Sequence, residues 1–187
     1  VDGGSILVDG VDTKKMTRHE LRDRFGMVLQ DAWLFEGSIR DNIAYAQDNL
    51  PEEKIIAAAR SASVDSFIKT LPGGYDFELS TGAENISQGQ RQLLTIARAM
   101  ASDPEIMILD EATSNVDTHT EQLIQKALAK LMHGRTSFVI AHRLSTIRDA
   151  DMILYMEHGD ILEHGSHEEL MAQHGKYEAL YMSQFAQ

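Results

Sequence analysis

Short apolar runs alternate with segments of helical periodicity along this chain. Four runs are rich in β-branched residues, Met and Leu, and contain no charge: Phe25–Leu29, Ile106–Leu109, Ser137–Ala141 and Met152–Met156. Continuous apolar runs of this length predict strands that are covered on both faces, as in a parallel sheet.

The segment Glu121–Met132, which lies between two of these runs, predicts a helix. Thr118 stands three residues before Glu121, which is the spacing of a capping box at a helix start. A strand, a helix and a second strand in this order indicate an α/β fold. The apolar residues of the segment recur at helical spacing, at Leu123, Ile124, Ala127, Leu128, Leu131 and Met132.

Residues 46–103 have a different pattern, with three helical segments in a row. Pro51 precedes the alanine-rich Glu52–Ala62, Val64–Leu71 ends at a Pro-Gly-Gly turn, and Ser87–Met100 follows a polar loop. Three helices with no strand between them predict a helical subdomain at 46–103. It would be inserted into an α/β core made of residues 1–45 and 104–187.

The end of the chain predicts a hairpin followed by a helix. The apolar residues 153–155 and 161–162 flank the turn residues His158, Gly159 and Asp160, which is a hairpin signal. Ser166 and Glu169 have the spacing of a capping box, so a last helix is expected to begin there.

Composition and charge narrow the class of protein. The 187 residues are 43% hydrophobic and 25% charged, which fits a single globular domain, and the net charge of −12 argues against nucleic acid as a partner. The absence of cysteine excludes disulfides and thiolate metal sites. No apolar stretch approaches the roughly 18 residues of a membrane span. The first residue is Val1, so we expect the chain to be part of a longer protein.

The strand Ile106–Leu109 leads directly into two carboxylates, Asp110 and Glu111. Open α/β sheets bind ligands at the carboxyl ends of their strands, and Mg²⁺ bound to phosphate would compensate the paired negative charges. Asp110 would then hold the metal and Glu111 would polarise an attacking water. The alternative is a helix N-terminus after the strand, where acidic residues are favoured in any case.

Polar residues elsewhere have two interpretations each. Ser87 and Gln90 have capping-box spacing, but a helix N-terminus with a serine and the nearby Gly89 also suits a phosphate. His142 follows the strand Ser137–Ala141 and could contact a γ-phosphate, although a lone histidine is more often structural.

Together these motifs resemble the nucleotide-binding domain of ATP-binding-cassette (ABC) transporters over essentially the whole chain. Residues 108–111 resemble the Walker B motif, Ile86–Gln90 the signature sequence, and Ser114–Asp117 the D-loop. Gln30 is similar to the Q-loop glutamine and His142 to the switch histidine. The resemblance implies an α/β RecA-like P-loop NTPase core, a parallel sheet flanked by helices, with an inserted helical subdomain.

The resemblance also implies a chemistry and a set of partners. ATP and Mg²⁺ would be the cofactors, with Glu111 and His142 catalytic and Asp110 and Gln30 at the metal. Two such domains would pair head to tail, so that the signature sequence acts on the nucleotide of the second domain. The intact module would hydrolyse ATP at the cytoplasmic face of the cell membrane as part of a transporter. The nucleotide-binding residues implied in this way are Gln30, Ser87, Gln88, Gly89, Gln90 and Asp117.

The segment Leu34–Ile43 is similar to the exporter form of the region after the Q-loop, which receives the coupling helices of a transmembrane domain. Trp33 and Phe35 would be exposed there for docking, or else fill the core. Ser80–Asn85 lies where exporters carry a loop that contacts the partner half. Gln88 and the D-loop sequence Ser-Asn-Val-Asp depart from the commonest family pattern. Together with the intact Glu111 and His142, they resemble the catalytically competent half of heterodimeric multidrug exporters, while homodimeric use stays open.

One family motif is absent from the sequence. A P-loop, or Walker A motif, needs Gly, four residues, Gly, Lys and then Ser or Thr, so that amides and a lysine hold the phosphates. We therefore expect an N-terminally truncated domain that is inactive on its own. Two alternatives remain, a non-catalytic interaction fragment and a soluble ABC ATPase without a transport role. None of the seven lysines has the required spacing: Lys14, Lys15, Lys54, Lys69, Lys126, Lys130 and Lys176.

Overall fold

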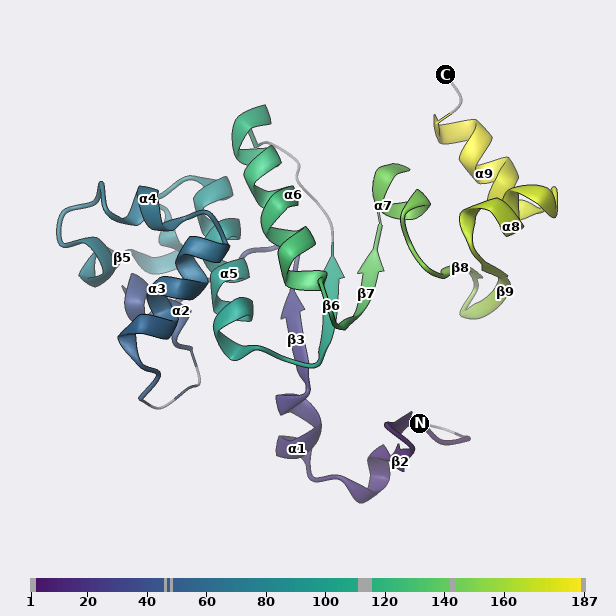
Figure 1. Cartoon of the computed structure of the whole chain (residues 1–187), viewed down its shortest axis with the longest axis horizontal. Helices are drawn as coiled ribbons and strands as arrows, with labels where there is room; N and C mark the ends of the chain where they lie inside the picture. The colour runs from purple at the N-terminus through teal and green to yellow at the C-terminus, as the bar shows by residue number, and fades with distance from the viewer. Residues whose placement is uncertain (1–2, 46, 48, 111–115, 142–143, 186–187) are drawn as a thin grey trace. The chain divides into compact units, whose positions relative to one another are not determined.

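The structure, a computed structural model, describes residues 3–45, 47, 49–110, 116–141 and 144–185. Contacts divide the chain into two compact units, Val1–Val139 and Ile140–Gln187, which we describe separately (Figure 1).

The first unit is organised around a three-stranded sheet with the order β3-β6-β7. The strands are β3 (Phe25–Val28), β6 (Ile106–Asp110) and β7 (Thr136–Ile140), which confirms three of the predicted strands to within one residue at each end. β3 and β6 are parallel, with Val28 opposite Leu109, and Figure 1 shows all three arrows pointing the same way. The predicted parallel sheet is therefore confirmed.

Helices cover one face of this sheet. Val28, Met107 and Leu109 are almost fully buried, whereas Met27 and Phe138 each keep 55% of their surface exposed. The expectation that these strands are covered on both faces is therefore wrong for the residues that the structure describes. Apolar runs do not report which face of a strand is covered, because both faces carry apolar side chains.

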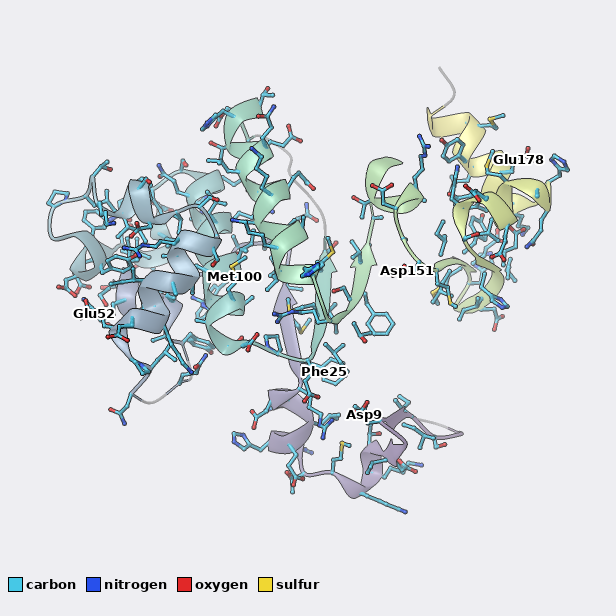
Figure 2. All side chains as sticks on the ribbon, in the orientation of Figure 1. Asp9, Phe25, Glu52, Met100, Asp151 and Glu178 are labelled. Carbon is cyan, nitrogen blue, oxygen red and sulfur yellow. The ribbon has the colours of Figure 1, made fainter. Side chains whose placement is uncertain are left out.

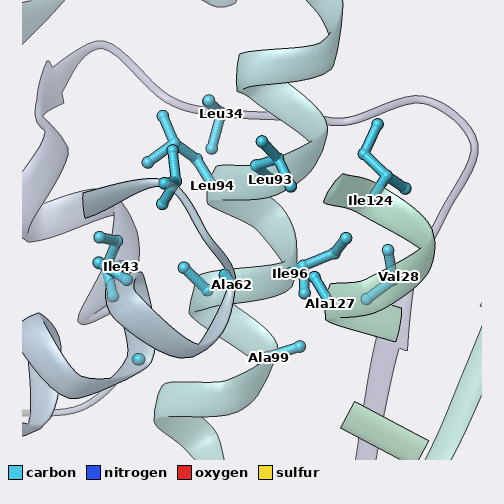
Figure 3. Packing of buried hydrophobic residues seen from close by; sticks show 14 of the residues in the cluster. Val28, Leu34, Ile43, Ala62, Leu93, Leu94, Ile96, Ala99, Ile124 and Ala127 are labelled. Atoms are coloured by element: carbon cyan, nitrogen blue, oxygen red, sulfur yellow. The ribbon is translucent and has the colours of Figure 1, made fainter. Parts of the chain in front are cut away.

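Helix α5 (Gln88–Ser102) forms the centre of the core. On one side of it lie α2 (Ile39–Ile43) and α3 (Glu52–Ser61), and on the other lie β3 and α6 (Thr118–Met132). Figure 3 shows the side chains of α5 meeting Ile43 and Ala62 on one side and Val28 and Ile124 on the other. Helices α3, α5 and α6 confirm three predicted helical segments to within three residues at each end, whereas α2 was not predicted.

Two expectations for residues 46–103 need correction. Helix α4 (Asp65–Ile68) ends three residues before the predicted end at Leu71. A two-residue strand, β5 (Glu78–Leu79), follows α4 and pairs antiparallel with β4 (Gly37–Ser38), so the expectation of no strand between these helices is wrong. A pairing of two residues is too short to produce a period in the sequence.

Helix α6 begins earlier than its sequence pattern predicted. Asp117 is the N-cap and its carboxylate accepts a hydrogen bond from the N–H of Thr120 at 3.0 Å, so the predicted Thr118–Glu121 capping box is wrong. Aspartate is as strong an N-cap as serine and stronger than threonine, which explains why the earlier residue prevails.

The beginning of the chain forms a small hairpin and a short helix. β1 (Leu7–Val8) pairs with β2 (Val11–Asp12), and a 3₁₀ turn (Thr13–Lys15) leads to α1 (Arg18–Asp23). Arg24 donates hydrogen bonds to Asp9 at 2.7 Å and to Glu105 at 3.2 Å. These ion pairs join the hairpin, in which Figure 2 labels Asp9, to the start of the sheet, where it labels Phe25.

The second unit contains the predicted hairpin. After α7 (Leu144–Arg148), β8 (Ile153–Glu157) pairs antiparallel with β9 (Asp160–Gly165), and α8 (His167–Ala172) and α9 (Lys176–Phe185) follow. Ser166 and Glu169 form the predicted capping box of α8, but α9 follows, so the expectation that the last helix begins at this box is wrong.

Helix α9 has a cap that comes from the hairpin. The carboxylate of Glu163 in β9 accepts hydrogen bonds from the N–H groups of Lys176 at 2.7 Å and Tyr177 at 2.9 Å.

Within the described ranges, no helix combines the length and the apolar character that crossing a membrane requires.

Candidate functional site

Gln30 and Asp110 lie at the same edge of the sheet. Because Val28 is opposite Leu109, the strands β3 and β6 end side by side, with Gln30 two residues beyond Val28 and Asp110 directly after Leu109. Gln30 is exposed and Asp110 is partly buried. This is the carboxyl edge of a parallel sheet, where α/β proteins bind ligands.

The chemistry of this pair fits a magnesium ion. The carboxylate of Asp110 and the side-chain carbonyl of Gln30 are hard oxygen donors, and Mg²⁺ in proteins takes one or two such ligands together with phosphate and water. Within the described part of the chain, no group of three or more His, Cys, Asp or Glu side chains is arranged to hold a metal by itself. Glu111 and His142 lie outside the described residues, so their predicted roles stay predictions.

The N-terminus of α5 carries the predicted capping box. The side chain of Ser87 accepts from the N–H of Gln90 at 3.3 Å, and the side chain of Gln90 accepts from the N–H of Ser87 at 2.8 Å. Ser87 is exposed, and the first-turn amides of a helix have no partner within the helix. The structural interpretation of Ser87 and Gln90 is thus confirmed, and it is compatible with a phosphate at the same helix end.

Gly89 lies where α5 meets α6. It is buried, and a β-carbon added there would overlap the side-chain methyl group of Thr120 and lie 3.1 Å from a methyl group of Val116. The sequence suggested this glycine only as a point of approach for phosphate. The structure shows that packing alone requires the absence of a side chain at this position.

Asp117 also lies at this junction, as the N-cap of α6. The N–H and the hydroxyl of Thr120 hydrogen-bond its carboxylate and hold the pKa of Asp117 below its ordinary value. Asp117 is therefore ionised at neutral pH and neutralises part of the positive end of the α6 dipole.

Exposed aromatic side chains gather beyond the end of β3. We call Trp33, Phe35 and Tyr45 the aromatic surface, and their ring centres lie 5.8–6.2 Å apart. Trp33 is 58% exposed and Tyr45 is 47% exposed, while Phe35 is half-buried. The predicted exposure holds for Trp33, and Phe35 lies between the two alternatives. Sequence reasoning missed Tyr45, because no motif includes it.

The polar loop Ser80–Asn85 is attached on both sides. The hydroxyl of Thr81 donates to the carboxylate of Glu36 at 2.6 Å, which ties the loop to the segment that follows β3. From α5, Arg91 donates to the carbonyl oxygens of Ala83 at 3.2 Å and Ile86 at 3.3 Å. The loop therefore connects the segment that follows β3, which carries the aromatic surface, to the N-terminal part of α5.

Comparison with known proteins places these features in one family. The family described as "ABC transporter" matches residues 1–114. An uncharacterized ABC transporter ATP-binding protein of Bacillus subtilis, YfiC, is 54% identical over 97% of this chain and 30% of its own length. An ATP-dependent lipid A-core flippase of Desulfotalea psychrophila is 50% identical over 97% of this chain and 32% of its own.

A solved structure shares the fold. The structure of a bacterial Atm1-family ABC exporter with ATP bound superposes with a TM-score of 0.88 at 40% identity, over 99% of this chain and 32% of that one. The chain thus spans about a third of the length of the relatives it matches.

Proposed function

The chain belongs to the ABC transporter family, and we propose that it is part of the ATP-binding module of an exporter; the intact module binds ATP with Mg²⁺ and hydrolyses it to drive transport. The observation that carries this proposal is the identity of about half with ABC transporter ATP-binding proteins, a lipid A-core flippase among them, along nearly the whole chain. The likeness to the structure of an ABC exporter supports it. The position of Gln30 and Asp110 at one sheet edge supports it.

In this proposal the sheet edge acts on the nucleotide of its own domain. Asp110 and Gln30 supply oxygen ligands to Mg²⁺, which when bound neutralises charge on the phosphates. Glu111, the next residue along the chain, takes a proton from the attacking water as general base. His142 donates a hydrogen bond to the γ-phosphate and stabilises the charge that develops on it.

The helix ends would act on a second, related domain that pairs head to tail with this one. Ser87, Gln88, Gly89 and Gln90 present a helix N-terminus to the phosphates of that domain's nucleotide, and Asp117 lies beside them. The exposure of Ser87 and the proximity of the α5 and α6 N-termini support this role, because both helix ends carry partial positive charge. The second domain could be identical or different.

The aromatic surface would receive a transmembrane domain at the cytoplasmic face of the membrane. Exposed Trp33 and Tyr45 support this, since aromatic residues are enriched in protein interfaces. A mycobacterial relative that is 54% identical is named a fatty acid ABC transporter ATP-binding/permease protein, and a permease part in that relative supports a transmembrane partner here.

Residues 46–103 would be the helical subdomain of the module, and 1–45 with 104–187 its core.

A second candidate concerns the 187 residues by themselves. They contain no stretch with the glycine and lysine spacing of a P-loop. We propose that these residues alone do not turn over ATP and instead serve as an interaction module for the second domain and the membrane domain. Turnover of Mg-ATP by the isolated chain would refute this.

The test of the proposed function uses the complete product of the gene that encodes this chain. Glu111→Gln should lower the ATP hydrolysis rate about 10²- to 10⁴-fold, which is the usual contribution of a general base, while bound ATP is retained. Glu53→Gln, an exposed glutamate on α3, is the matched control and should leave the rate unchanged. Hydrolysis by the Glu111 variant at the wild-type rate would reject the proposal.

A further inference from the structure

Arg98 reaches from the middle of α5 to the aromatic surface. Its Nε donates to the carbonyl oxygen of Asn42 at 2.7 Å, and one Nη donates to the carbonyl oxygen of Trp33 at 3.0 Å. The other Nη donates to the side-chain oxygen of Asn42 at 2.9 Å. The carbon at the centre of the guanidinium lies 4.8 Å from the ring centre of Tyr45 and 5.8 Å from that of Trp33.

The charge of this side chain is compensated in an uncommon way. Among the described residues, no carboxylate lies within 4.0 Å of Arg98, although a partly buried guanidinium usually pairs with one. Carbonyl oxygens and the faces of two aromatic rings take that place. Within the part of the chain that the structure describes, the groups that stabilise the Arg98 guanidinium belong to residues 33–45, so this side chain in turn orders that segment.

Asn42 completes the network from inside. It is fully buried, and its side-chain nitrogen donates to the carbonyl oxygens of Phe35 and Ser38, each at 3.0 Å. Its side-chain oxygen accepts from the N–H of Phe35 at 3.1 Å, as well as from Arg98. The segment is therefore wrapped around Asn42, and Arg98 attaches both its beginning, at Trp33, and its end to α5.

We infer that Arg98 is a positioning residue that holds the aromatic surface in a single arrangement and makes it one rigid body with α5. Arg98 stands eleven residues after Ser87 on the same helix, which is roughly 16 Å at 1.5 Å per residue. A displacement of the aromatic surface would therefore move the N-terminus of α5. This inference rests on the proposed function only for the identity of the partner that displaces the surface.

The chain offers a direct readout, because Trp33 is its single tryptophan. Arg98→Lys keeps the charge but loses the planar fork that bonds Asn42 and Trp33 together, and Arg98→Ala removes both. Arg91→Lys is the matched control, since Arg91 lies on the same helix and also donates to two backbone carbonyls, but contacts no aromatic ring in the described chain.

We expect both Arg98 variants to lose much of the near-ultraviolet circular dichroism and of the fluorescence anisotropy of Trp33, measured on the chain without nucleotide. The Arg91 control should keep both signals, and far-ultraviolet spectra identify any variant that fails to fold. If Arg98→Ala fails to fold, the Trp33 signals of Arg98→Lys alone test the inference. Wild-type Trp33 signals in the folded Arg98→Lys variant would overturn the inference.

The link to α5 is tested in the complete gene product. Arg98→Lys should reduce the stimulation of ATP hydrolysis by transported substrate while the basal rate stays within about twofold of wild type. If the stimulation of ATP hydrolysis is unchanged although the Trp33 signals are reduced, the proposed coupling between the aromatic surface and α5 is overturned. The Trp33 measurement needs no ATP, so it still tests the positioning role of Arg98 if the proposed ATPase function is rejected.

Discussion

Replacing Gly89 by alanine tests the contact between α5 and α6. The added methyl group would overlap the methyl group of Thr120. Gly89 is buried in the first turn of α5, and Thr120 is half-buried in the first turn of α6. Overpacking of this kind costs about 1–3 kcal/mol, because side chains and backbone must shift. Alanine also favours the helix over glycine by at most about 1 kcal/mol.

The net expectation is a loss of about 1 kcal/mol in the free energy of unfolding, which corresponds to about 2–4 °C in melting temperature for a chain of this size. Urea denaturation of the chain without nucleotide measures the first quantity and thermal denaturation the second. Neither signal depends on any role of Gly89 in phosphate binding.

A second substitution isolates the steric cause. Thr120→Ser removes the methyl group that Gly89→Ala would meet, yet keeps the hydroxyl and the N–H that bond Asp117. The double variant should therefore recover at least half of the loss, with a coupling energy of about 0.5 kcal/mol or more. If Gly89→Ala stabilises the chain, or if the two changes are additive, the packing explanation of this glycine is refuted.

Two further predictions concern polar groups away from this junction. Glu163→Ala removes the cap of α9 and should cost the second unit about 1 kcal/mol, seen as faster hydrogen exchange in α9 but not in α5. The hydrogen bond from Lys69, helped by Tyr75 and Arg60, lowers the pKa of Asp65 below its ordinary value, so the folded chain binds this proton less readily than the unfolded chain does. Stability should therefore fall as the pH drops below the unfolded pKa and through the folded one, and Asp65→Asn should flatten this part of a pH series of urea midpoints. An unchanged slope in that variant would contradict the assignment.

Local sequence patterns were enough to predict many of the regular elements. The strands β3 and β6, the hairpin β8–β9 and the capping boxes at Ser87 and Ser166 depend on residues close together in the chain, and the structure has them. The predicted start of α6 was wrong because Asp117 and Thr118 both suit an N-cap, and the difference in N-cap preference between aspartate and threonine is small.

Long-range contacts left no such signal. Arg98 bonds Asn42 and Trp33 across 56 and 65 residues, and the overlap of Gly89 with α6 follows from the packing of two helices. For the candidate site, the family resemblance already implied that Gln30 and Asp110 share a metal. The register of β3 against β6 brings the two residues to one edge of the sheet. The roles of Glu111 and His142 depend on the motifs alone.

The parallel pairing of β3 with β6 also governs the order in which the first unit can fold. Phe25 pairs with Ile106, and the neighbouring contact of Arg24 with Glu105 spans 81 residues. At ribosomal rates of 5–20 residues per second, β3 would wait roughly 4–16 s for its partner strand to be made. During that time the hydrogen-bonding groups of β3 that face β6 have no partner from β6, so β3 is a segment of the nascent chain that a chaperone would protect.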